Sequence, residues 1–216
     1  TFSGTGNSLH AARELAARFH GTVLIPIMSA LQEDEIKANT NILGLVFPIH
    51  AFTFPWPVKC FLERADFSSV SYIFAVATRE CFAKVFDDID KLLAKQGKHL
   101  DAGFAFEMPQ NYLPVFEVYS PEECQRTERG MQEALDTIQK TLADKAPHRP
   151  QDPAWLFPLS HFVMPLISGY FRKLRFPNME RSFYADQGCN GCGVCEKVCL
   201  TGKISLVDGR PEWDET

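Results

Sequence analysis

Phe2-Ser3-Gly4-Thr5-Gly6-Asn7-Ser8 forms a glycine-rich turn at the start of the chain. We expect this turn to end a strand and to open a helix at Asn7. Small residues let main-chain N–H groups converge, and the positive end of the helix dipole adds to their effect. The turn can therefore hold a phosphate without a lysine, and the side chains of Ser3, Thr5, Asn7 and Ser8 can supply further donors.

Three other interpretations of the turn fit the residues less well. A Walker A loop requires a lysine where Asn7 stands. A dinucleotide-binding fingerprint requires a third glycine where Leu9 stands, and residues 23–27 contain no acid for a ribose hydroxyl. An ordinary helix cap explains one serine or threonine, but not five small or polar donors in six residues.

Apolar runs typical of strands alternate with helical patterns over the first 145 residues, which predicts a doubly wound α/β domain with a parallel sheet. We expect strands at Thr22–Ile27, Asn41–Phe47, Ser71–Thr78 and Ala102–Glu107. We expect helices at Asn7–Phe19, Pro57–Arg64, Ala83–Gln96 and Pro121–Ala146, with a weaker candidate at Ala30–Lys37. In such folds a complete strand precedes the glycine-rich turn, so we expect residues of a mostly missing first strand to lie before Thr1.

A change of composition over Lys145–Pro153 marks the end of this domain. The apolar stretch Ala154–Phe171 follows, but Pro158, His161 and Pro165 interrupt it, so we do not expect it to span a membrane. We interpret it as a connector packed on the main domain, and an amphipathic segment at a membrane surface is the alternative.

Composition excludes some classes of function. Hydrophobic residues make up 45% and charged residues 23%, which is ordinary for a globular protein. A net charge of −5 argues against a nucleic-acid partner. The N-terminal residues are polar rather than basic and then apolar, so we expect no signal peptide and a cytoplasmic protein.

Four of the seven cysteines lie close together, as Cys189-x2-Cys192-x2-Cys195-x3-Cys199. Thiolates at this spacing bind an iron–sulfur cube, and the glycines between them let the backbone turn toward the sulfides. Zinc ribbons place their cysteine pairs farther apart. No cysteine follows Cys199, so we expect this chain to lack the second ligand set of a two-cluster protein.

These motifs together resemble the ferredoxin-fused flavodoxin family. The turn is similar to the flavodoxin pattern Ser/Thr-x-Thr-Gly-x-Ser/Thr, and residues 108–112 resemble the Met-Pro-x-Asn-Tyr segment of the fused proteins. The cysteine run resembles bacterial ferredoxins, although Leu200 stands where they usually have proline. The resemblance implies a flavodoxin-like domain over 1–147, a connector over 148–182 and a partial ferredoxin-type domain over 183–216.

The resemblance also implies the cofactors and the residues that bind them. FMN is expected, with two [4Fe-4S] clusters in the intact protein. The FMN-binding residues would come from the turn and from the loops after the sheet strands: Ser3, Gly4, Thr5, Gly6, Asn7, Ser8, Pro48, Ile49, His50, Ala51, Thr78, Arg79, Asn111 and Tyr112. Phe52 and Trp56 are alternative stacking partners for the flavin ring. Iron would be bound by Cys189, Cys192, Cys195 and Cys199.

The function implied is intracellular electron transfer between iron–sulfur clusters and FMN in anaerobic metabolism. The partner would be a redox protein or a small-molecule acceptor, and we expect no catalytic residue. One alternative is a flavin-dependent reductase of a small molecule or quinone, with a pocket near His50, Cys81 and Tyr112. Another is a redox or iron sensor that acts as an interaction module.

Overall fold

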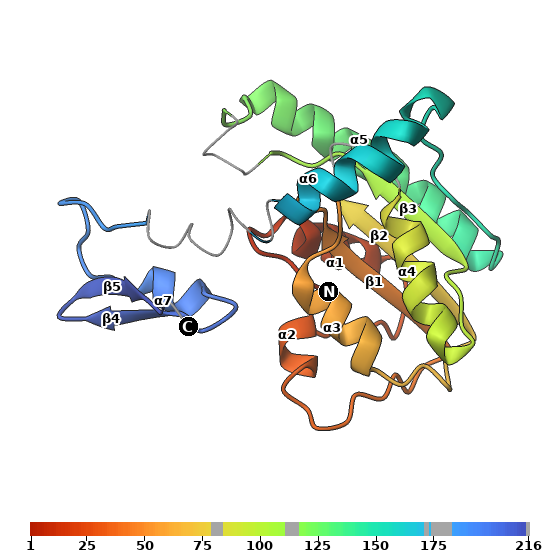
Figure 1. The fold of residues 1–216 in the computed structure, drawn as a ribbon, viewed down its shortest axis with the longest axis horizontal. Coiled ribbons are helices and arrows are strands. Elements are labelled where there is room, and N and C mark those ends of the chain that lie inside the picture. The colour runs from red at the N-terminus through yellow and green to blue at the C-terminus, as the bar shows by residue number, and fades with distance from the viewer. Residues whose placement is uncertain (79–83, 111–116, 171–172, 174–182, 215–216) are drawn as a thin grey trace. The chain divides into compact units, whose positions relative to one another are not determined.

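The computed structural model describes residues 1–78, 84–110, 117–170, 173 and 183–214, and the statements below refer to these residues. The chain divides into two compact units, Thr1–Met164 and Pro165–Thr216 (Figure 1). The division falls inside the stretch expected as a connector. Each unit is described by itself.

The first unit contains a three-stranded parallel sheet with the order β1-β2-β3. Its strands are β1 (Ile42–Pro48), β2 (Tyr72–Thr78) and β3 (Ala102–Phe106). Ile42 pairs with Tyr72 and Phe74 with Ala102. All seven residues of β2 are buried because helices cover both faces of the sheet. Three of the four predicted strands and the α/β class are therefore confirmed.

The fourth predicted strand, Thr22–Ile27, is not formed. Residues 22–26 have no regular structure, and Val23 is 77% exposed. The Thr1 amino group donates to the Ile25 carbonyl, and Ile27 N–H donates to the Thr1 carbonyl. Two hydrogen bonds are too few to form a regular pair of β-strands. The segment at Thr22–Ile27 therefore lies beside Thr1 without being a strand of the sheet. On the other side, Phe2 N–H donates to the Val46 carbonyl at 2.9 Å.

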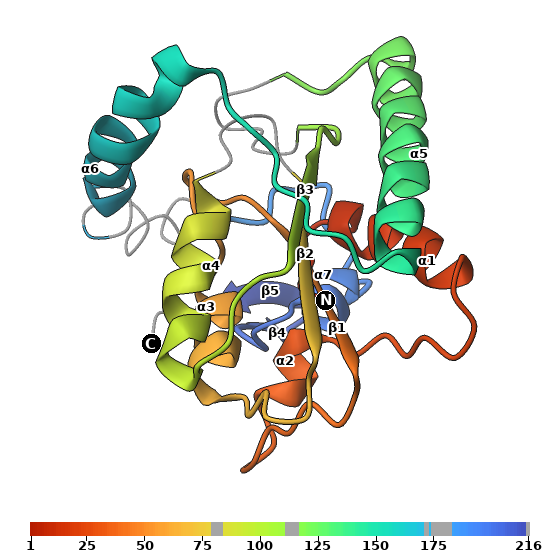
Figure 2. The same ribbon diagram turned by 90° about the vertical axis from the view of Figure 1, so that its right-hand side faces the viewer.

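One face of the sheet packs against α1 (Asn7–Ala17) and α5 (Pro121–Ala143). Figure 2 shows the sheet nearly edge-on with these two helices on one side of it. Ser120 begins α5 through a capping box with Glu123, which satisfies main-chain donors at the helix start. Buried residues of α5 recur every three to four positions and meet the sheet: Thr127, Met131, Leu135, Ile138 and Leu142.

The opposite face packs against α3 (Trp56–Arg64) and α4 (Val85–Leu93), which continues as a 3-10 turn, η1 (Ala94–Gln96). Phe47, Leu62 and Ile89 are fully buried in this core. The sheet is thus the middle layer of three, as the predicted helices require.

The weaker helix predicted at Ala30–Lys37 is wrong. A short helix, α2 (Ile27–Ala30), ends at the first residue of the predicted range, residues 31–35 form turns and bends, and Lys37 forms an isolated bridge with Asp66. Residues 33–35 are three successive acids with no apolar period to bury. The Arg64 guanidinium instead donates to the carbonyls of Leu31 and Glu33, both at 2.8 Å, and so supports a non-helical turn.

The end of the first unit is a helical run made of η2 (Ala154–Leu156) and the π-helical turn η3 (Leu159–Val163), and the same run continues as α6 (Met164–Tyr170). No helix in the described part of the chain is both long and apolar enough to cross a bilayer.

The second unit contains α7 (Val194–Val198) and a hairpin of β4 (Ile204–Val207) and β5 (Arg210–Trp213). Asp208 and Gly209 form the turn between the two strands of this hairpin.

Candidate functional site

The glycine-rich turn forms an open loop at the start of α1. Gly6 caps the helix in a left-handed conformation with φ of 102°, and its N–H donates to Ser3 Oγ at 3.1 Å. Gly4 and Gly6 are exposed, with no neighbouring atom within 4 Å of the place where a Cβ would stand. The first turn of α1 carries no acidic residue. The positive end of an eleven-residue helix is therefore open to an anion.

Two long-range hydrogen bonds attach this loop to the sheet. Ser8 Oγ lies 2.8 Å from Thr78 Oγ1 at the end of β2, and both side chains are buried. Asn7 Nδ2 donates to the carbonyl of Pro109, which follows β3, at 2.8 Å. Both residues were predicted to help bind a phosphate, and here they also fix the loop at the carboxyl edge of the sheet.

The loop after β1 lies at the same edge. Pro48 ends β1, and Ile49 N–H donates to the Thr78 carbonyl at 3.1 Å. His50 and Thr53 exchange two main-chain hydrogen bonds, at 2.7 and 3.1 Å, around a two-residue turn.

The residues of that turn, Ala51 and Phe52, have φ of 46° and 67°. This left-handed conformation favours glycine or asparagine, so the turn is strained. Strain of this kind is concentrated at functional sites.

The His50 ring lies edge-on to Phe2, with 6.3 Å between the ring centroids. Burial of the ring among neighbouring protein atoms lowers the pKa of His50 below 6.5, although the residue keeps contact with solvent. The imidazole is therefore mainly neutral at pH 7. Of the alternative stacking residues, Trp56 is 62% exposed at the start of α3, with Lys59 Nζ 4.9 Å from its ring centroid.

The structure thus brings together the predicted residues of the turn, of the β1 loop and of the β2 end. Arg79, Asn111 and Tyr112 lie outside the described residues, as does Cys81. The two anchoring bonds were not predicted, because they join residues 70 and 102 positions apart. The polar Thr78 at the end of an otherwise apolar strand is the sequence signal that could have indicated the first of them.

A surface cavity of about 260 Å³ lies elsewhere in the first unit, beside the residues that precede β3. Its lining includes His99, Asp101 and Arg149, and Arg149 is paired with Asp90 at 2.8 Å. In a parallel sheet this is the edge opposite to the one that carries the glycine-rich loop. The cavity is therefore not where the predicted phosphate site lies.

The predicted iron ligands all belong to the second unit. Gly191 and Gly193 take left-handed conformations, with φ of 70° and 74°, so the backbone turns tightly between the cysteines. A Cβ at Gly191 would stand 2.8 Å from the Gly209 carbonyl oxygen, so only glycine fits this approach to the β4–β5 turn. Within the described residues, no three potential ligands converge on a common point.

The surroundings of Cys199 favour its thiolate form. Burial acts to raise the pKa of this thiol, but hydrogen bonds outweigh it and hold the pKa below its usual value. They come from the Thr201 hydroxyl, whose oxygen lies 3.4 Å from the sulfur, and from the main chain of Thr201, Lys203 and Ile204. Thiolate is the form that binds iron.

No protein-family model matches the chain, and no curated protein matches it significantly.

Proposed function

We propose that the protein is an electron carrier of the ferredoxin-fused flavodoxin type, with FMN on the first unit and an iron–sulfur cluster on the second. The position of the glycine-rich loop carries this proposal. Hydrogen bonds tie the loop and the β1 loop to Thr78, so both lie at the carboxyl edge of a parallel sheet. Ligands of α/β proteins bind at that edge, where the strand order reverses.

The order of the chain segments also supports a flavodoxin-like arrangement. Thr1 is hydrogen-bonded to Ile25 and Ile27 on one side, and Phe2 is hydrogen-bonded to Val46 of β1 on the other. Across the sheet, the spatial order is therefore the segment at Ile25–Ile27, residues 1–2, β1, β2 and β3. The order is 2-1-3-4-5, which is the flavodoxin order, if residues 1–2 are counted in the place of a first strand and the extended but unpaired segment at Ile25–Ile27 in the place of a second. The glycine-rich loop then follows the first strand, at the switch point of the sheet.

The residues of the loop fit an FMN phosphate. Space over Gly4 and Gly6 is open, and the positive end of α1 has no acid in its first turn to compete. FMN supplies the ability to accept either one electron or two. The chain's own part is to hold the phosphate, to present the strained turn at Ala51 and to keep a neutral His50 beside it.

The cysteine run fits an iron–sulfur cluster in its chemistry, because it offers four thiols and the glycine turns that such a site needs. The thiols must still draw together on iron, since the described arrangement brings no three of them to one point. Iron binding is therefore measured together with flavin binding in the test.

The flavin test compares FMN with riboflavin, which lacks the phosphate. We expect the wild-type protein to prefer FMN. Gly4→Glu should weaken FMN binding by about tenfold or more, because it puts a negative charge beside the phosphate, and should change riboflavin binding little. Gly4→Gln has nearly the same size without the charge and is the control. Equal binding of FMN and riboflavin by the wild type, or of neither, contradicts the proposal.

The iron test uses the same protein after anaerobic reconstitution with iron and sulfide. We expect Cys195→Ser to lose most of the bound iron and Cys124→Ser to keep it, because Cys124 is an exposed cysteine on α5 far along the chain from the cluster motif. An iron-free wild-type protein, or equal iron in the two variants, contradicts the cluster. Turnover of a quinone that requires FMN would favour the reductase alternative over a simple carrier.

A further inference from the structure

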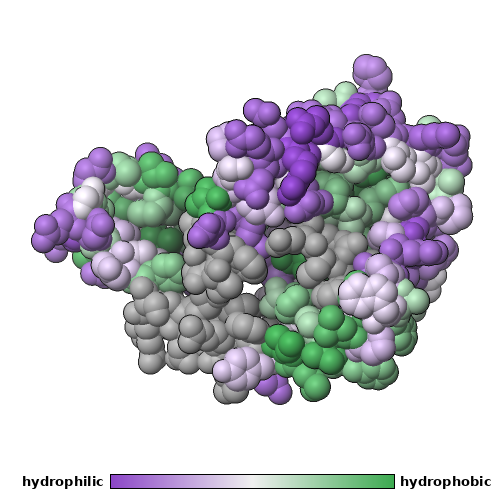
Figure 3. Space-filling model, turned by 90° about the horizontal axis from the view of Figure 1, so that it is seen from above, coloured by the Kyte–Doolittle hydropathy of each residue, from purple (hydrophilic) through white to green (hydrophobic). Residues whose placement is uncertain are grey.

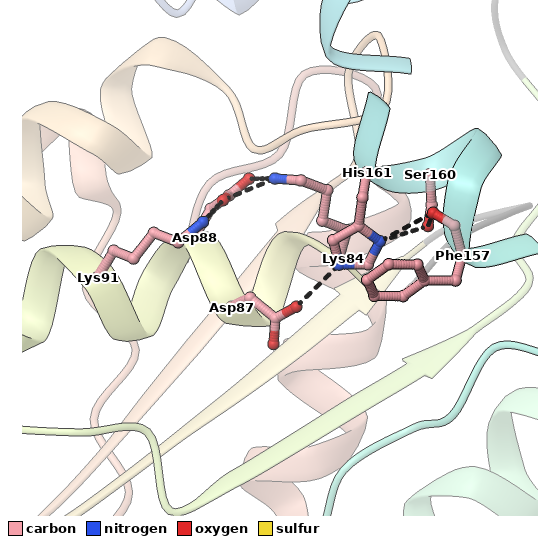
Figure 4. A network of polar contacts seen from close by, with 7 residues as sticks. All are labelled: Lys84, Asp87, Asp88, Lys91, Phe157, Ser160 and His161. Atoms are coloured by element: carbon pink, nitrogen blue, oxygen red, sulfur yellow. Dashed lines mark hydrogen bonds and ion pairs between the residues drawn. The ribbon is translucent and has the colours of Figure 1, made fainter. Parts of the chain in front are cut away.

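The charged side chains around the start of α4 pair with one another. Figure 4 shows this network, in which Asp88 accepts hydrogen bonds from Lys84 at 2.7 Å and from Lys91 at 3.0 Å. In the same network His161 Nε2 lies 3.6 Å from Asp87 Oδ2. Each basic group there faces a carboxylate. The network therefore attaches the helical run to α4, and its cations are already used within the protein.

Lys145 differs from those side chains because no carboxylate of the described residues forms an ion pair with it. Figure 3 shows hydrophilic residues gathered in the upper half of the view of the first unit, on the side where α5 lies in Figure 2. Lys145 follows the end of that helix and is exposed. It lines the surface cavity of about 260 Å³ that lies beside the residues preceding β3. The cavity therefore has a cation that is free to meet a ligand.

The backbone of Lys145 has a conformation that is unusual for lysine. Lys145 N–H donates to the Leu142 carbonyl at 3.3 Å, and Ala146 N–H donates to the Thr141 carbonyl at 3.0 Å, which is the Schellman pattern that ends a helix. Glycine usually stands at this position because φ is positive there, and Lys145 has φ of 47°. A lysine complements the negative end of the helix dipole, but it does so in the last turn without this strain. Strained residues of this kind are concentrated at functional sites.

Asp101 is the acid among the lining residues of the cavity, and both of its oxygens already interact. Oδ2 accepts from the Ile73 N–H at 2.7 Å, and Oδ1 lies 3.1 Å from His99 Nε2, which also lines the cavity. Asp144 stands next to Lys145 and is exposed, but it is not one of the lining residues. The negative charge at the cavity is therefore used within the protein.

Arg149 adds further donors to the lining. Its Nη2 donates to Asp90 Oδ2 at 2.8 Å and to the Leu100 carbonyl. The other oxygen of Asp90 accepts from the Leu100 N–H at 2.6 Å. Within the described part of the chain, the N–H groups on Nε and Nη1 of Arg149 donate to no other residue. The lining thus offers Lys145 and part of Arg149 as donors without acceptors.

Hydrogen bonds hold the wall of the cavity in place without a ligand. In Figure 2 the segment that follows α5 passes beside β3. Gly103 N–H donates to the His148 carbonyl at 2.8 Å, and the His148 ring stacks on Phe104 with 4.5 Å between centroids. The Tyr72 hydroxyl donates to the Ala146 carbonyl at 2.7 Å. Sites for small molecules are usually formed in advance in this way.

We propose that this cavity binds a small molecule through a phosphate group, with Lys145 and Arg149 as the residues that hold the phosphate. A phosphate has three free oxygens and up to two charges, so it accepts from both side chains at once, whereas a carboxylate offers two oxygens in one plane. Pockets for drug-sized ligands begin at about 300 Å³, so a cavity of about 260 Å³ fits a phosphorylated compound smaller than a nucleotide. The site lies at the edge of the sheet opposite to the glycine-rich loop. It therefore goes beyond electron transfer and depends on neither FMN nor iron.

The test follows the main-chain amide signals of the full chain by NMR while glycerol 3-phosphate, glycerol or acetate is added. We expect glycerol 3-phosphate to shift the signals around Asp101 and Lys145 until they saturate, and glycerol and acetate to leave them nearly unchanged. Lys145→Gln should weaken the binding by about tenfold or more, because it removes a charge-assisted hydrogen bond to the phosphate. Lys140→Gln removes the same charge from an exposed position on α5 and should bind like the wild type.

A second variant separates binding from stability. Lys145→Gly relieves the left-handed strain, so it should unfold at the same or a higher urea concentration than the wild type and still lose the binding. The proposal is overturned by the absence of a saturable shift, by equal binding of glycerol or acetate, or by equal affinity of the wild type and either Lys145 variant. The signals of residues 3–8 report the glycine-rich loop separately, so failure of the flavin proposal does not affect this test.

Discussion

The hydrogen bond between Ser8 and Thr78 should make a large and strongly non-additive contribution to stability. It joins the start of α1 to the end of β2 at 2.8 Å, and its two residues are 1% and 6% exposed. Ser8→Ala leaves a buried threonine hydroxyl without its partner, and Thr78→Val leaves a buried serine hydroxyl. We expect each single change to cost about 1–3 kcal/mol of unfolding free energy.

The double variant should cost less than the two single changes together. Replacing both partners by apolar groups of similar shape leaves no unpaired hydroxyl, so its cost should be about 1 kcal/mol. The coupling between the two sites, which is the sum of the two single costs minus the cost of the double variant, is then about 1–5 kcal/mol. Urea unfolding at pH 7, followed by far-UV circular dichroism, measures all four proteins.

An exposed hydrogen bond provides the control for this cycle. Thr137 Oγ1 donates to the Glu133 carbonyl at 3.2 Å on the outer side of α5. Thr137→Ala should change stability by no more than about 0.5 kcal/mol. If the Ser8 and Thr78 changes add to within about 0.5 kcal/mol, the bond does not hold α1 on the sheet and the argument fails.

Two further predictions concern packing and pH. Gly103→Ala should lower the free energy of unfolding by about 1–3 kcal/mol, because a Cβ there would stand 2.8 Å from the buried Phe86 ring. Gly130→Ala, in open space on α5, should raise the free energy of unfolding by about 0.5–1 kcal/mol in the same urea experiment. A change of the same sign in both variants would refute this reasoning. Burial and the charge of Asp101 raise the pKa of Tyr72, so the stability that its hydroxyl contributes is present below about pH 10 and is lost as pH rises further through the raised value. Tyr72→Phe should lower the urea midpoint at pH 8 and reduce the fall between pH 8 and pH 10.5, and an unchanged fall would contradict this reasoning.

Local sequence patterns were sufficient to predict a strand where apolar residues fill a segment that has a paired neighbour. Runs such as Tyr72–Thr78 are apolar throughout, and the structure has strands within one residue of three predicted positions. The patterns failed at Thr22–Ile27, which is as apolar as a strand. Strand formation needs a paired neighbour, and the apolar character of a segment does not say whether it has one.

The sequence by itself determined which reactive groups are present and how they are spaced: a glycine-rich loop before a helix, and four cysteines separated by two, two and three residues. Those features depend on residues close together in the chain. Only the tertiary structure decided that Ser8 meets Thr78, that Asn7 meets Pro109, and that Phe162 is exposed while Ser160, two residues before it, is buried. Such contacts join distant segments through packing and buried hydrogen bonds, and no local spacing of residues encodes them.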